Sequence, residues 1–287
     1  MVRDNFHSGY VAVIGRPNVG KSTLINALIG EKVSIVTAKP QTTQMNILGI
    51  AHLPKAQIIF IDTPGLLSGK QKKLNPKQIN KETRNALAMA DLALIVVEAN
   101  RWRKDDDDLI QKIEEFALDK ILIVNKIDLY KDKTQILDFL AQSSIKAEFK
   151  EIVPVSALRG KNINRLRALI EQYLPIQKAH FDEGILTDKN MVFRISEIVR
   201  EKFMRSLREE LPYSFTCEVD HLEEKPNLML IELSILLEKE SHKKIIIGKK
   251  GQTLKRVGTE SRKEIEKLLG KKVFLSSVVK VNKKTRV

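Results

Sequence analysis

The chain has 287 residues, of which 43% are hydrophobic and 30% are charged. This length predicts two domains or one large one, and the composition excludes global disorder, collagen and small disulfide scaffolds. Cys217 is the single cysteine, which excludes an internal disulfide and fits a reducing compartment. No apolar run reaches the roughly 20 residues that span a bilayer, and the N-terminus lacks a signal or transit pattern, so we expect a cytoplasmic protein.

The charge is positive and unevenly distributed. Fifty lysines and arginines against 36 aspartates and glutamates give a net charge of +14. Residues 248–287 alone carry ten lysines and three arginines against three glutamates, or +10. Such a basic segment indicates a surface for a polyanion. On charge alone, nucleic acid and an ordinary solvated face are equally favoured, and an acidic membrane surface comes third.

Residues 1–175 alternate short, β-branched runs with amphipathic helical stretches. The expected strands are Tyr10–Ile14, Ile58–Ile61, Leu92–Val97, Ile121–Val124 and Ile152–Val155. The expected helices are Lys21–Gly30, Lys77–Ala90, Asp105–Leu118 and Asn162–Tyr173, and the four aspartates at 105–108 suit a helix N-terminus. This alternation predicts an α/β domain over 1–175 with a mostly parallel sheet and helices on both faces.

The second half of the chain has a different pattern. Residues 174–189 show no clear period and contain Pro and Gly, so we place a linker at 176–189. A smaller α+β domain is expected over 190–287. Its order is helix, strand, strand, helix, loop, helix, strand, with the longer elements at Val192–Glu210, Thr216–Leu222, Leu228–Glu238, Gln252–Leu269 and Val273–Val281.

The stretch GRPNVGKS matches the phosphate-binding P-loop, GxxxxGK[ST], and lies between an expected strand and an expected helix. Its glycines let successive backbone N–H groups point at phosphate oxygens, and the helix N-terminus adds partial positive charge. Lys21 is expected to reach the β- and γ-phosphates and Ser22 to ligate Mg²⁺. The predicted nucleotide-binding residues of this loop are Gly15, Arg16, Pro17, Asn18, Val19, Gly20, Lys21, Ser22 and Thr23.

A second candidate loop, DTPG, follows the strand that ends at Ile61. Asp62 is expected to hold Mg²⁺ through water, and the Gly65 N–H to sense the γ-phosphate. Taken alone, DxxG is better explained as a surface turn. The position at a strand end supports nucleotide binding by Asp62, Thr63, Pro64 and Gly65.

The tetrapeptide NKID follows another buried strand and indicates recognition of guanine. The Asp128 carboxylate can accept two hydrogen bonds from guanine N1 and N2, a donor pair that adenine lacks. Asn125 would tie this loop to the P-loop, and the stem of Lys126 would pack over the base. Ser156 and Ala157 follow the last strand, where the Ala157 N–H would reach guanine O6. The predicted base-binding residues are Asn125, Lys126, Ile127, Asp128, Ser156 and Ala157.

GRPNVGKS, DTPG, NKID and SAL in this order resemble the motifs of translation-factor-related GTPases. The resemblance implies GTP hydrolysis and a first switch at TTQ, residues 42–44. There Thr43, with Thr42 as the alternative, would close over Mg²⁺ and the γ-phosphate. The resemblance makes Ser22, Thr43 and Asp62 the metal-binding residues, and Lys21, Asn18, Thr43 and Gly65 the catalytic ones.

Two positions of this resemblance bear on the rate of hydrolysis. Leu66 follows DTPG where Ras-like proteins have a glutamine that orients the attacking water. Asn18 matches the K⁺ ligand of potassium-activated relatives, although a loop-bracing side chain is the alternative. We therefore expect slow hydrolysis that is helped by K⁺ or by a partner, through cations that neutralise phosphoryl charge.

The tetrapeptide GKKG is a GxxG loop between III and a cationic helical stretch. The order of elements around it resembles a KH domain of type II, in which the loop approaches the backbone of a single-stranded nucleic acid. A helix–turn–helix with a soluble face is the alternative. The residues expected to meet RNA are Gly248, Lys249, Lys250, Gly251, Lys255 and Arg256.

A GTPase followed by such a KH domain closely resembles the Era family, the bacterial GTPases of small ribosomal subunit assembly, over essentially the whole chain. The resemblance implies binding near the 3′ end of small-subunit ribosomal RNA and a peripheral inner-membrane pool in some members. Gln44 stands where the family usually has Arg, and the end VVKVNKKTRV lacks the Trp-containing tail of relatives. No feature indicates an obligate oligomer, so we expect a monomer.

Three other interpretations remain open. A metabolic phosphotransferase would use the P-loop, but NKID argues against it because nucleotide kinases rarely need a guanine reader. A ribosome-associated GTPase with another RNA target fits the same motifs. An RNA-binding protein with a catalytically weak GTPase half is disfavoured by the intact Lys21, Ser22, Asp62 and Asp128.

Overall fold

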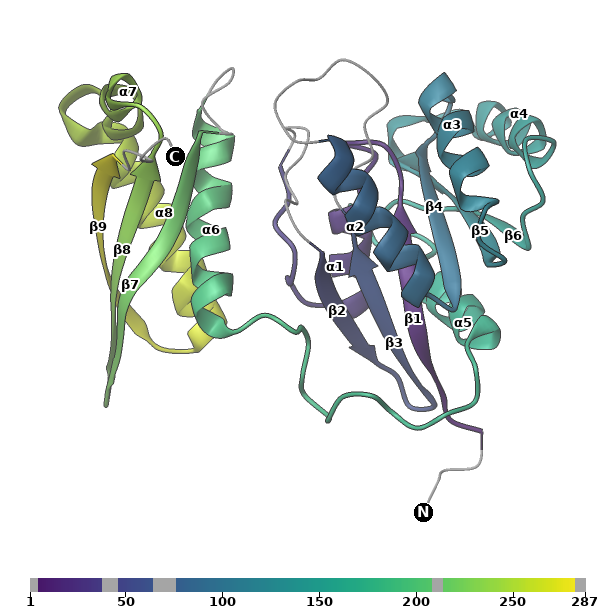
Figure 1. Ribbon diagram of the computed structural model, residues 1–287, viewed down its shortest axis with the longest axis horizontal. Helices are drawn as coiled ribbons and strands as arrows, with labels where there is room; N and C mark the ends of the chain where they lie inside the picture. Colours follow the sequence, from purple (N-terminus) through teal and green to yellow (C-terminus); the bar gives the residue numbers. More distant parts are fainter. Residues whose placement is uncertain (1–4, 38–45, 64–75, 208–213, 282–287) are drawn as a thin grey trace. The chain divides into compact units, whose positions relative to one another are not determined.

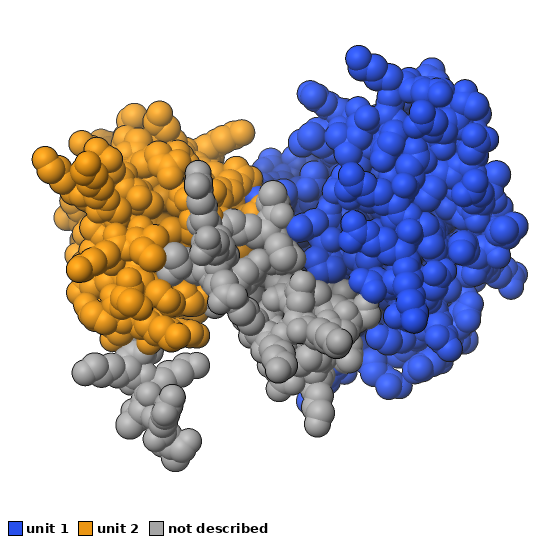
Figure 2. Space-filling view, turned by 90° about the horizontal axis from the view of Figure 1, so that it is seen from above, with its two compact units in different colours: residues 1–36, 40–188 blue, residues 37–39, 189–287 orange. Residues whose placement is uncertain are grey.

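The computed structural model describes residues 5–37, 46–63, 76–207 and 214–281. The chain divides into two compact units, coloured blue and orange in Figure 2. Unit 1 contains residues 1–36 and 40–188, and unit 2 contains residues 37–39 and 189–287. Within the described residues, unit 1 has a six-stranded sheet and unit 2 a three-stranded sheet.

The sheet of unit 1 is mostly parallel. Its strand order is β2-β3-β1-β4-β5-β6, and β2 alone among these strands runs antiparallel to its neighbour. The bounds are β1 His7–Ile14, β2 Ile47–His52, β3 Ala56–Asp62, β4 Leu92–Glu98, β5 Asp119–Asn125 and β6 Glu151–Pro154. The central strands are near-continuous runs of Val, Ile, Leu and Ala because both faces of the sheet are covered.

Helices pack on both faces of this sheet (Figure 1). Leu24 of α1 and Leu166 of α5 lie in the core on one face. Leu87 of α2, Ile110 of α3 and Phe139 of α4 lie in the core on the other face. The bounds are α1 Lys21–Ile29, α2 Pro76–Met89, α3 Lys104–Ile113, α4 Lys133–Ser144 and α5 Ile163–Tyr173. The predicted α/β class of this half is therefore what the structure shows.

Two elements of unit 1 are absent from the sequence-based expectation. Strand β2 is an edge strand whose identity depends on pairing with β3, from Ile47 opposite Asp62 to His52 opposite Gln57. Helix α4 buries little of its surface, so its apolar stripe is weak in the sequence. Neither element changes the order of the strands that carry the motifs.

The register of the sheet brings the motif-bearing strand ends together. Val13 lies opposite Asp62 across β1 and β3, and Glu98 lies opposite Asn125 across β4 and β5. Loops that follow the carboxyl ends of adjacent parallel strands share one edge of the sheet, where ligands bind in such folds.

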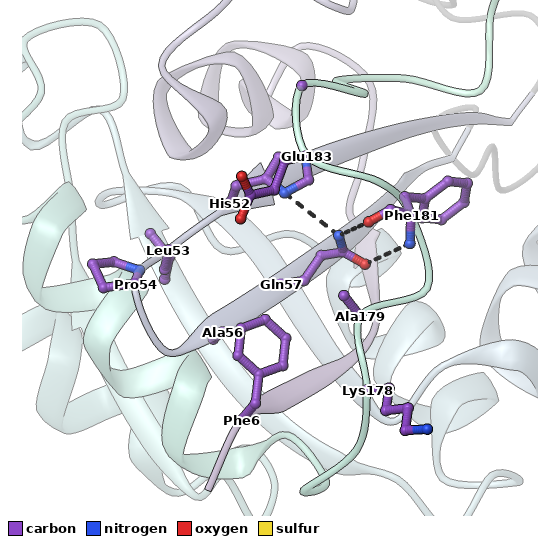
Figure 3. A pocket seen from close by; sticks show the side chains of 11 residues that line it. Phe6, His52, Leu53, Pro54, Ala56, Gln57, Lys178, Ala179, Phe181 and Glu183 are labelled. Atoms are coloured by element: carbon purple, nitrogen blue, oxygen red, sulfur yellow. Dashed lines mark hydrogen bonds between the residues drawn. The ribbon is translucent and has the colours of Figure 1, made fainter. Parts of the chain in front are cut away.

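The segment expected to be a linker packs against unit 1 up to Asp188. The Gln57 side chain holds it, because its Oε1 accepts from the backbone N–H groups of His180 (2.7 Å) and Phe181 (3.0 Å) and its Nε2 donates to the Phe181 carbonyl (2.7 Å). The Leu48 N–H donates to Asp188 Oδ1 at 2.9 Å. A pocket of about 970 Å³ lies between this segment and the β2–β3 turn, with Gln57 in its wall (Figure 3).

Unit 2 places its helices against one face of a sheet in the order β7-β8-β9. Strands β7 (Phe215–Lys225) and β8 (Leu228–Leu237) are antiparallel, and β9 (Lys272–Val281) is parallel to β8. Helix α6 (Met191–Ser206) contacts α8 (Gln252–Leu269), and the short α7 (Lys243–Ile247) precedes the GKKG loop. This is the predicted order of elements. Among the described residues, no helix combines the length and apolar composition needed to cross a bilayer.

Candidate nucleotide site and nucleic-acid interface

The P-loop runs from the end of β1 into the first turn of α1, as predicted. Gly20 has φ 100°, a conformation that favours glycine, and a Cβ built there would lie 2.4 Å from Asn125 Nδ2. The Gly20 carbonyl accepts the Leu24 N–H at 2.9 Å, which begins the helix. The loop is thus curled around its own backbone N–H groups, the arrangement that cradles phosphates.

Lys21 lies inside this loop. Its Nζ donates to the carbonyl oxygens of Gly15 and Arg16, both at 3.0 Å, and the residue is only 7% exposed. Burial lowers the pKa of Lys21 to about 8, the Asp62 carboxylate opposes that shift, and the nearby Arg16 charge adds to it. An ammonium group held in so dry a place gains from an anion beside it, which favours a bound phosphate.

The two described candidate metal ligands lie side by side. Ser22 Oγ donates to Asp62 Oδ2 at 2.9 Å, and Asp62 is fully buried at the end of β3. Thr63 Oγ1 donates to the Val13 carbonyl at 2.9 Å, which ties the start of the second motif to β1. A hydroxyl and a carboxylate oxygen next to a phosphate cradle are the donors that Mg²⁺ prefers, so this set fits the metal.

Some predicted residues cannot be placed in the same way. Thr42, Thr43, Pro64 and Gly65 lie outside the described residues. Asn18 is described; it is exposed in the P-loop with φ 64°. The remaining members of the loop, Pro17, Val19 and Thr23, are partly or fully buried beside it.

The loops predicted to read guanine meet at the same edge of the sheet. Asn125 Nδ2 donates to the Val19 carbonyl of the P-loop at 2.9 Å, and Asn125 Oδ1 accepts the Ala157 N–H at 3.1 Å. Ser156 Oγ donates to Asp128 Oδ1 at 2.5 Å. Asn125 therefore ties the two base loops to the phosphate loop, as expected. The Ala157 N–H, predicted to reach guanine O6, donates to Asn125 Oδ1 in this structure.

Two acidic residues outside the GTPase motifs, Glu98 and Asp106, form ion pairs with the motif residues Lys126 and Arg16. Glu98 Oε2 lies 2.7 Å from Lys126 Nζ, and Glu98 Oε1 lies 2.9 Å from Arg101 Nη1. Asp106 Oδ1 accepts from Arg16 Nε at 2.7 Å. Sequence reasoning assigned the aspartates at 105–108 to the helix N-terminus alone. Asp106 does accept the Arg103 N–H at 2.9 Å, but its pairing with Arg16 was missed.

In unit 2 the GKKG loop joins α7 to α8 and presents its cationic side chains to solvent. Gly248 and Gly251 both have φ 76°, and Lys250 has φ 49°, so the loop turns sharply. The Gly251 N–H donates to the Gly248 carbonyl at 3.1 Å. The exposed cationic residues of this loop and the next two turns are Lys249, Lys250, Lys255 and Arg256.

Comparison with known proteins bears on both units. A family model described as 50S ribosome-binding GTPase matches residues 10–126, and a KH domain model matches residues 210–286. GTPase Era of Xanthomonas oryzae pv. oryzae is 44% identical over 274 residues, which cover 96% of this chain and 91% of that protein. GTPase Era of Vibrio parahaemolyticus is 40% identical, with 97% and 87% covered. The chain belongs to the Era family of GTPases.

Solved Era structures share the whole fold of this chain. A crystal structure of Era in complex with MgGDPNP and nucleotides 1506–1542 of 16S ribosomal RNA matches with a TM-score of 0.92, 39% identity and 97% and 95% of the two chains covered. A structure of Aquifex aeolicus Era bound to GDP and AlF4⁻ matches equally well. The prediction of a P-loop GTPase domain followed by a KH domain is thereby confirmed. The protein is a GTPase with an RNA-binding domain.

Proposed function

We propose that this chain is a GTP-hydrolysing switch that binds the 3′ end of small-subunit ribosomal RNA through its KH domain during assembly of the small ribosomal subunit. The observation that carries the proposal is the match over nearly the full chain to Era in complex with MgGDPNP and a 16S ribosomal RNA segment. GTP binding orders the switch segments, and hydrolysis to GDP releases them. That change alters how the KH domain, residues 190–287, meets RNA.

Each part of the nucleotide site has its own role in this proposal. The backbone N–H groups of the P-loop residues other than Pro17, together with the Lys21 ammonium, bind the phosphates. Ser22, Asp62 and Thr43 hold Mg²⁺, which when bound neutralises phosphate charge. The Gly65 N–H contacts the γ-phosphate. These groups position the nucleotide and complement the charge that develops on the transferred phosphoryl group.

Guanine selection is assigned to Asp128. Its carboxylate lies in the loop that Asn125 ties to the P-loop, and Ser156 Oγ orients it. Asp128→Asn should shift preference from GTP toward xanthosine nucleotides, because the Asn amide donates where the carboxylate accepted. Competition binding of GDP and XDP to the two proteins measures this shift, and an unchanged base preference would remove the guanine assignment.

Potassium is assigned to Asn18, which is exposed in the P-loop and matches the K⁺ ligand of potassium-activated relatives. GTP turnover by the purified full chain in K⁺ should exceed turnover in Na⁺, and Asn18→Ala should abolish that difference. Equal rates in the two salts would reject the assignment and leave Asn18 as a loop-bracing side chain.

The RNA contacts are assigned to the GKKG loop, with Lys249, Lys250, Lys255 and Arg256 at phosphates. Gly251→Asp places a carboxylate in this loop and should weaken binding of a ribosomal RNA 3′-end oligonucleotide while basal GTP hydrolysis persists. Unaltered RNA affinity would contradict the KH assignment. An unrelated RNA that binds as tightly as the 3′-end oligonucleotide would favour another target.

The remaining assignments concern where the protein acts and in what form. We assign a cytoplasmic monomer with a peripheral pool at the inner membrane. Light scattering of the purified chain tests the monomer. Salt-sensitive recovery of the protein with membranes after cell fractionation would support the pool, and its complete recovery in the supernatant would reject it.

A further inference from the structure

A buried ion pair joins the P-loop to Asp106, a residue that belongs to none of the GTPase motifs. Arg16 Nε lies 2.7 Å from Asp106 Oδ1, and their side chains are 8% and 0% exposed. The pair joins the second residue of the P-loop to the first turn of α3, 90 residues away in the sequence.

Both partners of this pair are held by further hydrogen bonds. Arg16 Nη2 donates to the Arg101 carbonyl at 2.9 Å, so the guanidinium has one acceptor on the connection between β4 and α3 and another in the first turn of α3. Asp106 Oδ2 accepts the Arg103 N–H at 2.9 Å. Helix α3 is itself fixed, because its other buried side chains, Leu109, Ile110 and Ile113, lie in the core under the sheet.

The backbone of Arg16 takes part in the phosphate cradle. Its carbonyl is one of the two that accept from Lys21 Nζ. At the other end of the loop, Asn125 Nδ2 holds the Val19 carbonyl. Pro17 and Asn18 thus lie between two anchored residues, which constrain the loop from both sides.

Stability of the fold does not account for this pair. Desolvating two charges costs about as much as their attraction returns, and neutral residues of similar volume often replace buried ion pairs without loss of stability. Burial raises the pKa of the Asp106 carboxyl even though Arg16 donates to it, which shows how unfavourable the position is for a charge. Because burying this ion pair adds little to the stability of the fold, we attribute its presence to the conformation that it gives the ligand-binding loop.

We propose that Asp106 is a positioning residue for nucleotide binding, which holds the Arg16 guanidinium and thereby the first half of the P-loop in the conformation that receives the phosphates. The proposal rests on the P-loop assignment above and is independent of the RNA target. The loop N–H groups contact the phosphates equally in the ground state and in the transition state. The pair therefore strengthens nucleotide binding and has little effect on the rate of the chemical step.

Three variants of the full chain test this role. Asp106→Asn removes the carboxylate charge and keeps an acceptor for the Arg103 N–H. Arg16→Met removes the guanidinium and keeps much of its apolar stem. The double variant removes both charges, so neither is left buried alone. Asp108→Asn, two residues beyond Asp106 in α3, is the control for the loss of one negative charge near the helix N-terminus.

We expect the Kd for GDP to rise about tenfold in each of the three variants, the lower end of what a hydrogen bond to a charged group contributes. The KM for GTP should rise by the same factor, with kcat changed less than about twofold. The two single variants should melt at lower temperature, and the double variant should regain the wild-type melting temperature without regaining nucleotide affinity. Asp108→Asn should match the wild type in all four measurements.

The double variant decides the matter even where a single variant fails to fold. A stable double variant with wild-type Kd and KM would overturn the proposal and leave the pair a structural contact. A fall in kcat at constant KM would also overturn it, because the pair would then act on the chemical step. Failure of the wild-type chain to bind GDP would instead refute the nucleotide assignment itself, so the two failures are distinct.

Discussion

The two glycines of the GKKG loop differ in how much space a Cβ atom would have. Substitution by alanine should therefore destabilise the loop by different amounts at the two positions. Gly248 has φ 76° and ψ 173°, and Gly251 has φ 76° and ψ 8°. A Cβ built on Gly248 would lie 2.2 Å from Thr253 Oγ1, 2.8 Å from Thr253 Cβ and 2.9 Å from the Thr253 backbone nitrogen. A Cβ on Gly251 meets nothing within 4 Å.

The costs of Gly248→Ala and Gly251→Ala follow from these contacts. Each alanine would carry backbone strain of about 1–3 kcal/mol, and the conformation of Gly248, with ψ 173°, is the one essentially restricted to glycine. At Gly248 the clash adds about 2 kcal/mol, because rotating the Thr253 side chain relieves the contact with Oγ1 but leaves those with Cβ and the backbone nitrogen. Removing the latter contacts requires the first turn of α8 to move. The difference of about 2 kcal/mol corresponds to roughly a 30-fold change in the population of the native loop.

Hydrogen–deuterium exchange of the full chain measures this population. The Gly251 N–H donates to the Gly248 carbonyl and reports opening of the loop. Its exchange should accelerate about 30-fold more in Gly248→Ala than in Gly251→Ala, and basal GTP hydrolysis in unit 1 should be unchanged in both. Equal exchange in the two variants would refute the steric argument and leave only the backbone preference of glycine.

Three further predictions concern single residues. Gly20→Ala should raise the Kd for GDP strongly, because the added Cβ would meet Asn125 Nδ2 at 2.4 Å; wild-type affinity in a titration would contradict this. Burial raises the pKa of the Cys217 thiol, so a thiol reagent at pH 8 should label the native chain far more slowly than the urea-unfolded chain. A hydrogen bond from Ser234 and the Lys280 charge lower the pKa of Asp220 below 3.8. The Asp220 carboxylate therefore stabilises the folded state above that pH, and this stabilisation is lost as the pH falls through its pKa in the folded protein. In Asp220→Asn the free energy of unfolding, measured by circular dichroism, should therefore fall less steeply as the pH is lowered.

The loops that carry the motifs could be placed in the fold from the sequence because each motif is local. The spacing of GRPNVGKS, the strand before each motif and the order of the motifs place the loops at one edge of a parallel sheet. The registers of Val13 with Asp62 and of Glu98 with Asn125 then follow from parallel pairing. The KH domain was predictable for a similar reason, since the elements flanking the GKKG loop read clearly in the sequence.

Features that depend on a distant partner were not predictable in this way. Strand β2 is defined by its pairing with β3. The segment that follows Pro175 lacks any periodicity of its own, yet the buried Gln57 amide orders it by donating and accepting at the same backbone stretch. In both cases the structure depends on a contact between residues far apart in the sequence, and no local sequence pattern predicts such a contact.

The buried ion pair shows that some of this information can nevertheless be recovered. Within the run of aspartates from 105 to 108, Asp106 is the one in helical register with Leu109, Ile110 and Ile113, the buried face of α3. A carboxylate on an apolar face requires a donor, because an unpaired buried charge is costly. Arg16, a cation of the P-loop that follows the neighbouring strand β1, can supply it. The helical period therefore distinguishes Asp106, which pairs with the P-loop, from the aspartates that only suit the helix N-terminus. More generally, we expect positioning residues among the charged side chains that occupy core positions of helices next to a motif.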